Sequence, residues 1–493
     1  MSRTIKWLCM LLAALMMLAT LAGCANQQSG QNGDTTTAGD GVSVDPTEEA
    51  LASLREEVDW DGKDFGILYI NDIGGYTEEV EAEANAGTTE TASAVINDAV
   101  FERNSLFEEY CNLEFVLIPI SQSGIASRVQ GEVQTATGDF QLITQTASNT
   151  ASAATSGFLY NYLDLDINYE QEWWDAGTLD FALNGRVFFM NGPFNIVDDD
   201  VTFVLMFNKK LREEYQIPDL YQTVKNHEWT LDYFNTTISK LATDNGDGKW
   251  DEKDTYGFSS PSTVGDTFFY GAGLRYIQNS RDMDMPELVL KDKMDQALEV
   301  LALARSIIHD NNSSYVATSG NEPIARDVFV EGRSLFYCEA ASYLRYLNSE
   351  MDDPYGVVPV PKYNQAQEKY TTWSHPIGST LSIPTSVAGS GANLDQFANV
   401  LEVYTILSQR LVRPAYYDMV LTTRNVHDAE SAEMLNIIFA NRTYDMAIYF
   451  LDLGYSGIFA SAASGSGDNF SSRYASLSKN FDGKISRLLK KLK

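Results

Sequence analysis

The sequence is poor in cysteine, histidine and basic residues. Of 493 residues, four are cysteines and four are histidines, and 35 lysines and arginines stand against 68 aspartates and glutamates, which gives a formal net charge of −33. A field of that sign repels nucleic-acid phosphates and anionic headgroups, so a nucleic-acid partner is excluded and solubility is favoured. Cys111 and Cys338 lie far apart in apolar surroundings, which predicts buried free thiols and no disulfide framework.

The motifs of common catalytic and nucleotide sites are also missing. The four histidines do not form an HExxH pair or another spacing typical of metal ligands, and no GxSxG or GxxxxGK[ST] segment occurs. Consecutive acidic residues such as those at 198–200 invite comparison with a glycosidase acid pair. With 68 acidic residues in the chain, such proximity is expected by chance. We therefore expect a protein that is not an enzyme.

Long apolar runs are confined to the start of the chain. Arg3 and Lys6 precede an apolar run over 7–21, and the small residues of "LAGC" lead to Cys24. This is the pattern of an export signal, and the cysteine resembles the one that is acylated in the bacterial lipoprotein box. A short transmembrane anchor is the alternative. We predict a signal peptide over 1–23 and a protein held outside the cytoplasm on the cell membrane by lipidated Cys24.

The next segment differs in composition from everything after it. Residues 25–45 are rich in Gly, Ser, Thr, Asn and Gln without an apolar period, so we expect a flexible linker over 24–57. Beyond it no uncharged run reaches the length of about 18 residues that a membrane span requires.

The folded part opens with an alternation of strand and helix patterns. Short apolar runs predict strands, and amphipathic stretches between them predict helices; in order the segments are 65–70, 97–111, 113–120, 123–138 and 140–146. Such an order implies a parallel sheet with right-handed crossovers. Ligands bind beyond the carboxyl ends of such strands, which makes residues 144–150 a candidate wall of a binding site. Further strands are expected over 185–195 and 201–208.

Several stretches together resemble one family. "NDAVFERNSLFEEY" (97–110), "FVEGRSLFY" (329–337), "YGVVPVPKYNQAQEKY" (355–370), "RPAYYDMVL" (413–421) and "HDAESAEMLNII" (427–438) are similar to the family 1 extracellular solute-binding proteins of bacterial ABC importers. The maltodextrin-binding proteins are the best-known relatives of that family. The resemblance implies an α/β fold of the periplasmic-binding-protein-like type II class, with two lobes joined by hinge strands around a ligand cleft.

The resemblance also implies a division of the chain and a function. Lobe one would comprise 58–197 plus 384–428, and lobe two 199–374 plus 430–493. The protein would be a monomer that requires no cofactor, binds a carbohydrate or oligosaccharide and delivers it to the transmembrane subunits of an ABC permease. A lipid-anchored glycan-active enzyme and a receptor for a peptide or another small solute are the alternatives.

A site for a sugar needs aromatic platforms and polar groups that form paired hydrogen bonds. Such residues occur where the implied fold places the cleft, and the candidates are Gln145, Thr146, Asp266, Phe268, Phe269, Glu339, Trp373 and His375. Phe268 and Phe269 have an alternative role in the core, as aromatic residues usually do. Trp373 and His375 are the better candidates, because a hinge strand faces the cleft.

The stretch "TDNGDGKWDEKD" (243–254) is similar to an EF-hand loop, with Thr243 where the first aspartate would stand. A calcium ion takes about six to eight oxygen ligands. The available donors are the side chains of Asn245, Asp247, Asp251 and Asp254 and the carbonyl of Lys249. The segment is either a structural calcium clip or a polar turn without an ion, in which the glycines serve only the backbone geometry.

Overall fold

The computed structural model describes residues 45–54, 57–82, 92–279, 285–310, 312–318, 320–389, 391–421, 428–465 and 469–491. Residues Thr47–Lys493 group into one unit, which begins just after the start of helix α2 (Pro46–Leu54). The predicted signal peptide, Cys24 and most of the predicted linker lie outside the described residues. A search of the described helices for one long and apolar enough to span a bilayer finds none.

The first sheet has the strand order β12–β3–β1–β2. Strand β1 (Asp64–Ile70) pairs in parallel with β2 (Glu114–Ile120) and β3 (Leu142–Thr146), and β12 (Ser379–Ser382) joins β3 antiparallel. Helices α3 (Ala92–Cys111) and α4 (Gln122–Thr135) connect the parallel strands, so the alternation predicted from periodicity is confirmed. Gly66 lets β1 approach the loop before β3, because a Cβ there would lie 2.3 Å from the Asp139 carbonyl oxygen.

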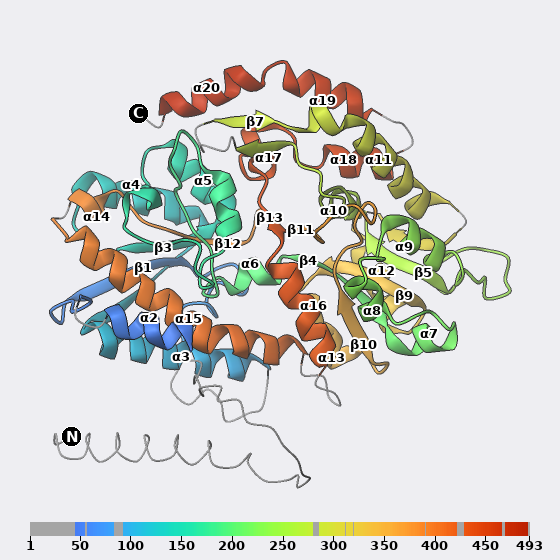
Figure 1. Ribbon diagram of the computed structural model, residues 1–493, viewed down its shortest axis with the longest axis horizontal. Coiled ribbons are helices and arrows are strands. Elements are labelled where there is room, and N and C mark those ends of the chain that lie inside the picture. Colours follow the sequence, from blue (N-terminus) through green and yellow to red (C-terminus); the bar gives the residue numbers. More distant parts are fainter. Residues whose placement is uncertain are drawn as a thin grey trace, which may run out of the picture. The chain divides into compact units, whose positions relative to one another are not determined.

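The second sheet has the order β10–β4–β9–β5–β8. Its strands are β4 (Phe203–Asn208), β5 (Tyr256–Pro261), β8 (Ser314–Ala317), β9 (Ser334–Ala340) and β10 (Tyr355–Val358). Strand β5 is parallel to β8 and β9, whereas β4 is antiparallel to β9 and β10. The helices of this part are α7 (Lys209–Glu214), α8 (Leu220–Lys225), α9 (Leu231–Ile238), α10 (Val264–Gly271), α11 (Met294–His309), α12 (Glu322–Val330) and α13 (Tyr343–Glu350). We call the parts around the two sheets lobe one and lobe two (Figure 1).

The remaining elements pack around both lobes. They are α5 (Ala147–Thr155), β6 (Ile277–Asn279), β7 (Pro286–Leu288), α14 (Ser386–Gly389), α15 (Leu394–Leu421), α16 (Ala429–Phe439), α17 (Met446–Tyr449), α18 (Ile458–Ser464), α19 (Phe470–Ser478) and α20 (Phe481–Lys491). The first half of α15 shares a core with lobe one, including Phe397 and Phe107. Its second half, including Tyr416, shares a core with Tyr337 and Leu344 of lobe two. Helix α15 therefore joins the two lobes, although the resemblance implies that 384–428 belongs to lobe one alone.

Three segments run between the sheets. The first is residues 190–202 with helix α6 (Ile196–Asp200), the second is residues 374–378, and the third leads into β13 (Arg442–Thr443), which pairs with β11 (Thr372–Trp373). Figure 1 shows α6, β11 and β13 between the two sheets. The strand expected over 185–195 is not formed, because this apolar run is buried between other elements and makes only an isolated bridge, from Met190 to Leu381. Cys111 and Cys338 are free and buried, as predicted.

A buried cluster of charges holds these segments together. Helix α6 carries three consecutive aspartates, and Asp198 and Asp199 are each 2% exposed. The Arg442 guanidinium donates to Asp199 at 2.6 Å and to Asp175 at 2.7 Å, and it lies 3.2 Å from Asp198. Tyr444 donates to Asp198 at 2.6 Å. The third segment is thus tied to the first by paired charges.

Two further arginines complete the cluster from both lobes. Arg413 of α15 donates to Asp199 at 2.7 Å. Arg345 of α13 in lobe two pairs with Asp200 and lies 3.1 Å from Glu78 of lobe one. Because each aspartate of α6 has a cationic partner from another part of the chain, the cluster fixes where the three segments cross.

Glu79 adds a buried acid beside the same cluster, and the charge of Arg103 compensates it in part. Its side chain is 1% exposed, and one carboxylate oxygen accepts from the Val197 amide at 3.1 Å and the Ser379 hydroxyl at 2.6 Å. The other oxygen, Oε1, has no hydrogen-bond partner among the described residues. Burial raises the pKa of Glu79 to about 8, against the hydrogen bonds from Ser379 and Val197, which lower it.

We expect a pH dependence of stability from Glu79. Its folded-state pKa of about 8 exceeds the reference value of 4.5, so the folded protein holds this proton more tightly than the unfolded chain. The free energy of unfolding should therefore fall as the pH rises from about 4.5 to 8, at about 1.4 kcal/mol per pKa unit at most. Glu79→Gln should remove this fall and exceed the wild type in stability above pH 8. Urea unfolding at pH values from 4 to 9 measures the free energy of unfolding, and Glu102→Gln, at an exposed residue, is the control. If the free energy of unfolding changed equally with pH in Glu79→Gln and in the wild type, the raised pKa of Glu79 would be contradicted.

Candidate functional site

The carboxyl ends of strands in both sheets meet the crossing segments. Strand β3 ends at Thr146, which pairs with Ser379, the first residue of β12 after the second crossing. Strand β9 ends at Ala340, which pairs with Phe203, the first residue of β4 after the first crossing. In open α/β sheets the carboxyl ends of strands are where ligands bind. The topology therefore places one candidate site at these two facing edges and the residues of the second crossing.

The second crossing presents its own side chains at this edge. His375 and Ile377 are exposed, the latter to 39%. Lobe one holds the backbone in place, since the Tyr76 hydroxyl donates to the Ile377 carbonyl at 2.6 Å and the Ser148 amide donates to the Pro376 carbonyl at 3.4 Å. An exposed turn fixed by main-chain contacts is a rigid wall for a ligand.

Four of the predicted ligand residues lie along these edges. Gln145 and Thr146 end β3, Glu339 is next to last in β9, and His375 donates its amide to the Val201 carbonyl at 3.1 Å. The side-chain oxygen of Thr146 is used locally, because it accepts from the Asn149 amide at 3.2 Å and caps α5. The Gln145 side chain is 1% exposed and is directed under α4 and α5.

Glu339 and His375 have shifted protonation equilibria. Burial raises the pKa of Glu339 to about 7, and an N–H bond from Ala340 at 3.0 Å partly opposes this. Desolvation lowers the pKa of His375, so its imidazole is neutral at pH 7. Its Nδ1 accepts from the Ile377 amide at 3.2 Å, which assigns the proton to Nε2. Neither Glu339 nor His375 carries a fixed positive charge, and both can form hydrogen bonds with neutral hydroxyls.

The other predicted ligand residues are directed into the core. Phe268 and Phe269 are 0% exposed, and Phe269 stacks on Tyr276 at 4.6 Å between ring centroids. Asp266 is 8% exposed and accepts from the Ala460 amide at 3.0 Å, and burial raises its pKa to about 6. The structure thus gives these three residues of α10 a packing role, which for the two phenylalanines is the alternative that the sequence left open.

Trp373 is not a ligand platform in this structure. It is 5% exposed, with its ring stacked on Phe203 at 4.7 Å and on Tyr270 at 5.7 Å, and its indole N–H donates to the Thr267 hydroxyl at 3.1 Å. Both faces and the polar edge are therefore occupied. Strand β11 ends at Trp373, whose ring is buried, and the turn that follows leaves His375 exposed.

The predicted calcium loop closes through its own amides. Asp254 is 0% exposed and accepts from the Asn245 and Asp251 amides at 2.8 and 2.7 Å. Asp247 and Asn245 likewise accept from backbone amides, of Lys249 and Asp247. Within the described ranges, no group of three or more His, Cys, Asp or Glu side chains is placed to hold a metal ion. Calcium binding by this loop stays a prediction.

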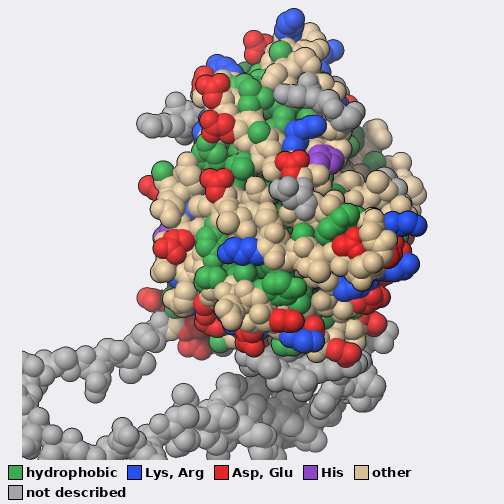
Figure 2. Space-filling model, turned by 90° about the vertical axis from the view of Figure 1, so that its right-hand side faces the viewer, with side chains coloured by type: hydrophobic (Ala, Val, Ile, Leu, Met, Phe, Trp, Pro, Cys, Tyr) green, Lys and Arg blue, Asp and Glu red, His purple; other side chains and the backbone are tan. Residues whose placement is uncertain are grey.

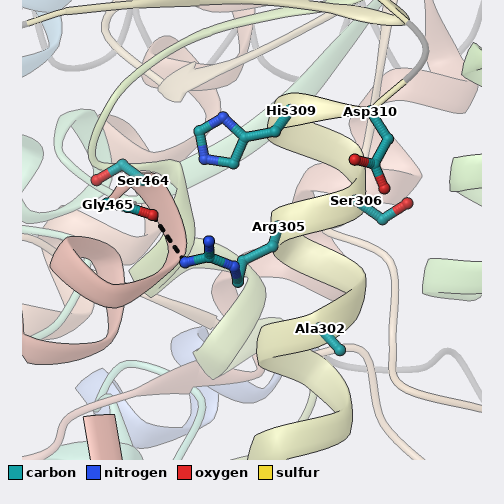
Figure 3. A pocket seen from close by; sticks show the side chains of 7 residues that line it. All are labelled: Ala302, Arg305, Ser306, His309, Asp310, Ser464 and Gly465. Atoms are coloured by element: carbon teal, nitrogen blue, oxygen red, sulfur yellow. Dashed lines mark hydrogen bonds between the residues drawn. The ribbon is translucent and has the colours of Figure 1, made fainter. Parts of the chain in front are cut away.

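Lobe two carries a further hollow on its surface, beside the ends of α11 and α18. Figure 3 shows Arg305 donating to the Gly465 carbonyl in this hollow, at a distance of 2.8 Å. Arg305 also donates to the Ala462 carbonyl at 2.7 Å, and His309 lies 3.1 Å from the Ala463 carbonyl. Both side chains cap the end of α18, which is a structural use of them. On the face seen in Figure 2, acidic and basic side chains are interspersed with hydrophobic ones.

The sequence did not single out Asn149, Tyr76 or Ile377. Asn149 lies within the predicted wall 144–150, so the position of that stretch after a strand was the signal for it. Tyr76 and Ile377 come together only through a contact across 301 positions of the chain. No pattern in the sequence marks such a pair.

The fold is shared with solved structures of binding proteins. A cyclo/maltodextrin-binding protein complexed with maltotetraose is similar over 86% of this chain and 97% of its own, with a TM-score of 0.57 and 11% identity. MalE from Xanthomonas citri is similar over 87% of this chain and 98% of its own, with a TM-score of 0.57 and 11% identity. UgpB from Mycobacterium tuberculosis, in complex with glycerophosphocholine, is similar over 80% and 95%, with a TM-score of 0.51 and 16% identity.

At these identities the comparisons establish the fold. The type II periplasmic-binding-protein-like class with two α/β lobes, which the resemblance implied, is confirmed. No family model and no curated protein matches the sequence.

The burial of Trp373 predicts that its replacement lowers the stability of the fold. Trp373→Ala should lower the free energy of unfolding by about 3–5 kcal/mol, because it opens a cavity between Phe203 and Tyr270. Trp250→Ala, at a side chain that is 40% exposed, should cost about 1 kcal/mol or less. Urea unfolding followed by circular dichroism compares the two. If Trp373→Ala were as stable as Trp250→Ala but bound ligand more weakly, the result would assign Trp373 to the ligand site and contradict its role in the core.

Proposed function

We propose that the chain is an extracytoplasmic solute-binding receptor of an ABC importer. The observation that carries this proposal is the meeting of the carboxyl edges of two sheets at three crossing segments. A solute bound there contacts both lobes at once. Such a solute favours a closed arrangement only through contacts that differ between the open and closed states. The transmembrane subunits of a permease are then the partner that receives the solute.

The proposed solute is a carbohydrate or oligosaccharide. Desolvation favours the neutral imidazole of His375, which offers an N–H donor, and Glu339 at the opposite edge has a pKa of about 7, so its carboxyl group can accept from sugar hydroxyls or, when protonated, donate to them. The solved proteins of the same fold include ones in complex with maltotetraose and with glycerophosphocholine. Maltotetraose is an oligosaccharide, which supports the proposed class, whereas glycerophosphocholine is a phosphodiester. The identity of the solute is left to experiment.

Binding without turnover is the test that separates a receptor from a glycan-active enzyme. A panel of mono- and oligosaccharides and short peptides is added to the protein, and unfolding and product formation are both measured. A matching sugar should stabilise the protein by about 2.7 kcal/mol at a hundredfold excess over its Kd. It should be recovered intact. Products would identify an enzyme, and stabilisation by peptides alone would identify a different class of receptor.

We further propose that lipidated Cys24 anchors the receptor to the membrane. Cys24→Ala should move the protein from the membrane fraction to the medium or wash, because acyl chains supply the anchoring free energy and an acidic protein has little affinity for anionic headgroups. Cell fractionation and a labelled fatty acid measure both effects. Cys111→Ala should keep the protein on the membrane. A Cys24→Ala protein that stays in the membrane fraction would indicate a transmembrane anchor instead.

A further inference from the structure

A small slot lies in the helical layer of lobe one, between α4 and α5. It has a volume of about 90 Å³. A water molecule takes about 30 Å³ of liquid volume, so the slot matches about three waters or one group of three or four non-hydrogen atoms. It begins beside β3, whose carboxyl end forms part of the candidate site described above.

Two amide side chains of the slot lack partners. Gln145, at the end of β3, and Asn149, in the first turns of α5, both line it. The terminal nitrogens of both, Nε2 and Nδ2, are buried and have no hydrogen-bond partner among the described residues. An unsatisfied buried donor costs about 1–3 kcal/mol, and two that line one slot are unusual in a folded protein. Both groups are N–H donors, so an acceptor oxygen in the slot would satisfy them.

The other residues that line the slot indicate which chemical groups can lie beside the acceptor oxygen. Val129 of α4, Ala153 of α5 and Phe158 supply apolar walls. The hydroxyls of Ser152 and Ser156 donate to backbone carbonyls at 3.1 and 2.9 Å, so they are not free donors. None of the residues that line the slot is charged, which disfavours a carboxylate or a phosphate.

We propose that the slot receives a short acyl-amide group, such as the acetamido group of an N-acetylated sugar. The carbonyl oxygen accepts from the amides of Gln145 and Asn149, and the methyl group packs on Val129 and Phe158. The proposal rests on the proposed function, since the sugar ring itself would occupy the site at the carboxyl end of β3. It narrows the solute to sugars that carry an N-acyl substituent.

A matched pair of sugars tests the substrate class. N,N′-diacetylchitobiose and cellobiose share linkage and ring stereochemistry and differ in the 2-substituent. Calorimetry should show at least tenfold tighter binding of the acetylated sugar. Gln145→Met should reduce that advantage to about twofold. Gln134→Met, the same change at an exposed residue of α4 outside the slot, should keep the full advantage. Cellobiose binding as tightly as the acetylated sugar would overturn the proposal.

A second measurement tests the slot without any sugar. Acetamide is titrated into ¹⁵N-labelled protein, and the side-chain NH₂ signals of Gln145 and Asn149, assigned through Gln145→Met and Asn149→Leu, should shift together. Unmoved signals at saturating acetamide would overturn the proposal and indicate that water alone fills the slot. If acetamide shifts them but no sugar binds, the acyl-amide site stands and the proposed carbohydrate function fails.

Discussion

The pairing of Arg442 with the aspartates of α6 is the interaction on which the arrangement of the molecule depends. Arg442 is 6% exposed and lies at most 3.2 Å from Asp175, Asp198 and Asp199. Removing one partner of a buried ion pair costs about 3–5 kcal/mol, since the other charge remains buried without compensation. A different packing of the three crossing segments would leave buried charges unpaired, and this cost exceeds the net stabilisation that the pairs give the observed packing. The cluster therefore contributes more to the specificity of the fold than to its stability.

This constraint also decides where the molecule can bend. Arg413 comes from α15, whose two halves pack on different lobes, and Arg345 comes from lobe two. Charges from both lobes thus converge on α6, so a relative movement of the lobes must pivot near that helix if the pairs are to stay intact. A pivot there lies next to the edges of β3 and β9, because Thr146 and Ala340 pair with the residues that follow the crossing segments.

The aromatic residues serve the interior more than the edge. Trp373 lies between Phe203 and Tyr270, and Phe269 packs with Tyr276 and Phe459. Such rings supply much of the buried area that holds α10 and α18 to the lobe-two sheet. The groups left at the facing edges are mostly polar, among them His375 and Glu339. The candidate site therefore offers groups that can form hydrogen bonds, and the rings of Trp373 and Phe269 lie in the interior.

The sequence by itself determined the strand–helix alternation of lobe one and the buried thiols, which follow from local periodicity and apolar surroundings. That residues 144–150 form a wall of the binding site stays a prediction, based on the rule that parallel strands present their carboxyl ends together. Only the tertiary structure decided which way Trp373 and the phenylalanines of α10 face, because a buried and a cleft-facing aromatic look alike in one dimension. It also joined Arg442 to Asp198 and Asp199 and left Gln145 and Asn149 without partners. Those relations depend on segments far apart in the chain, and their energies exist only where the folded core excludes water.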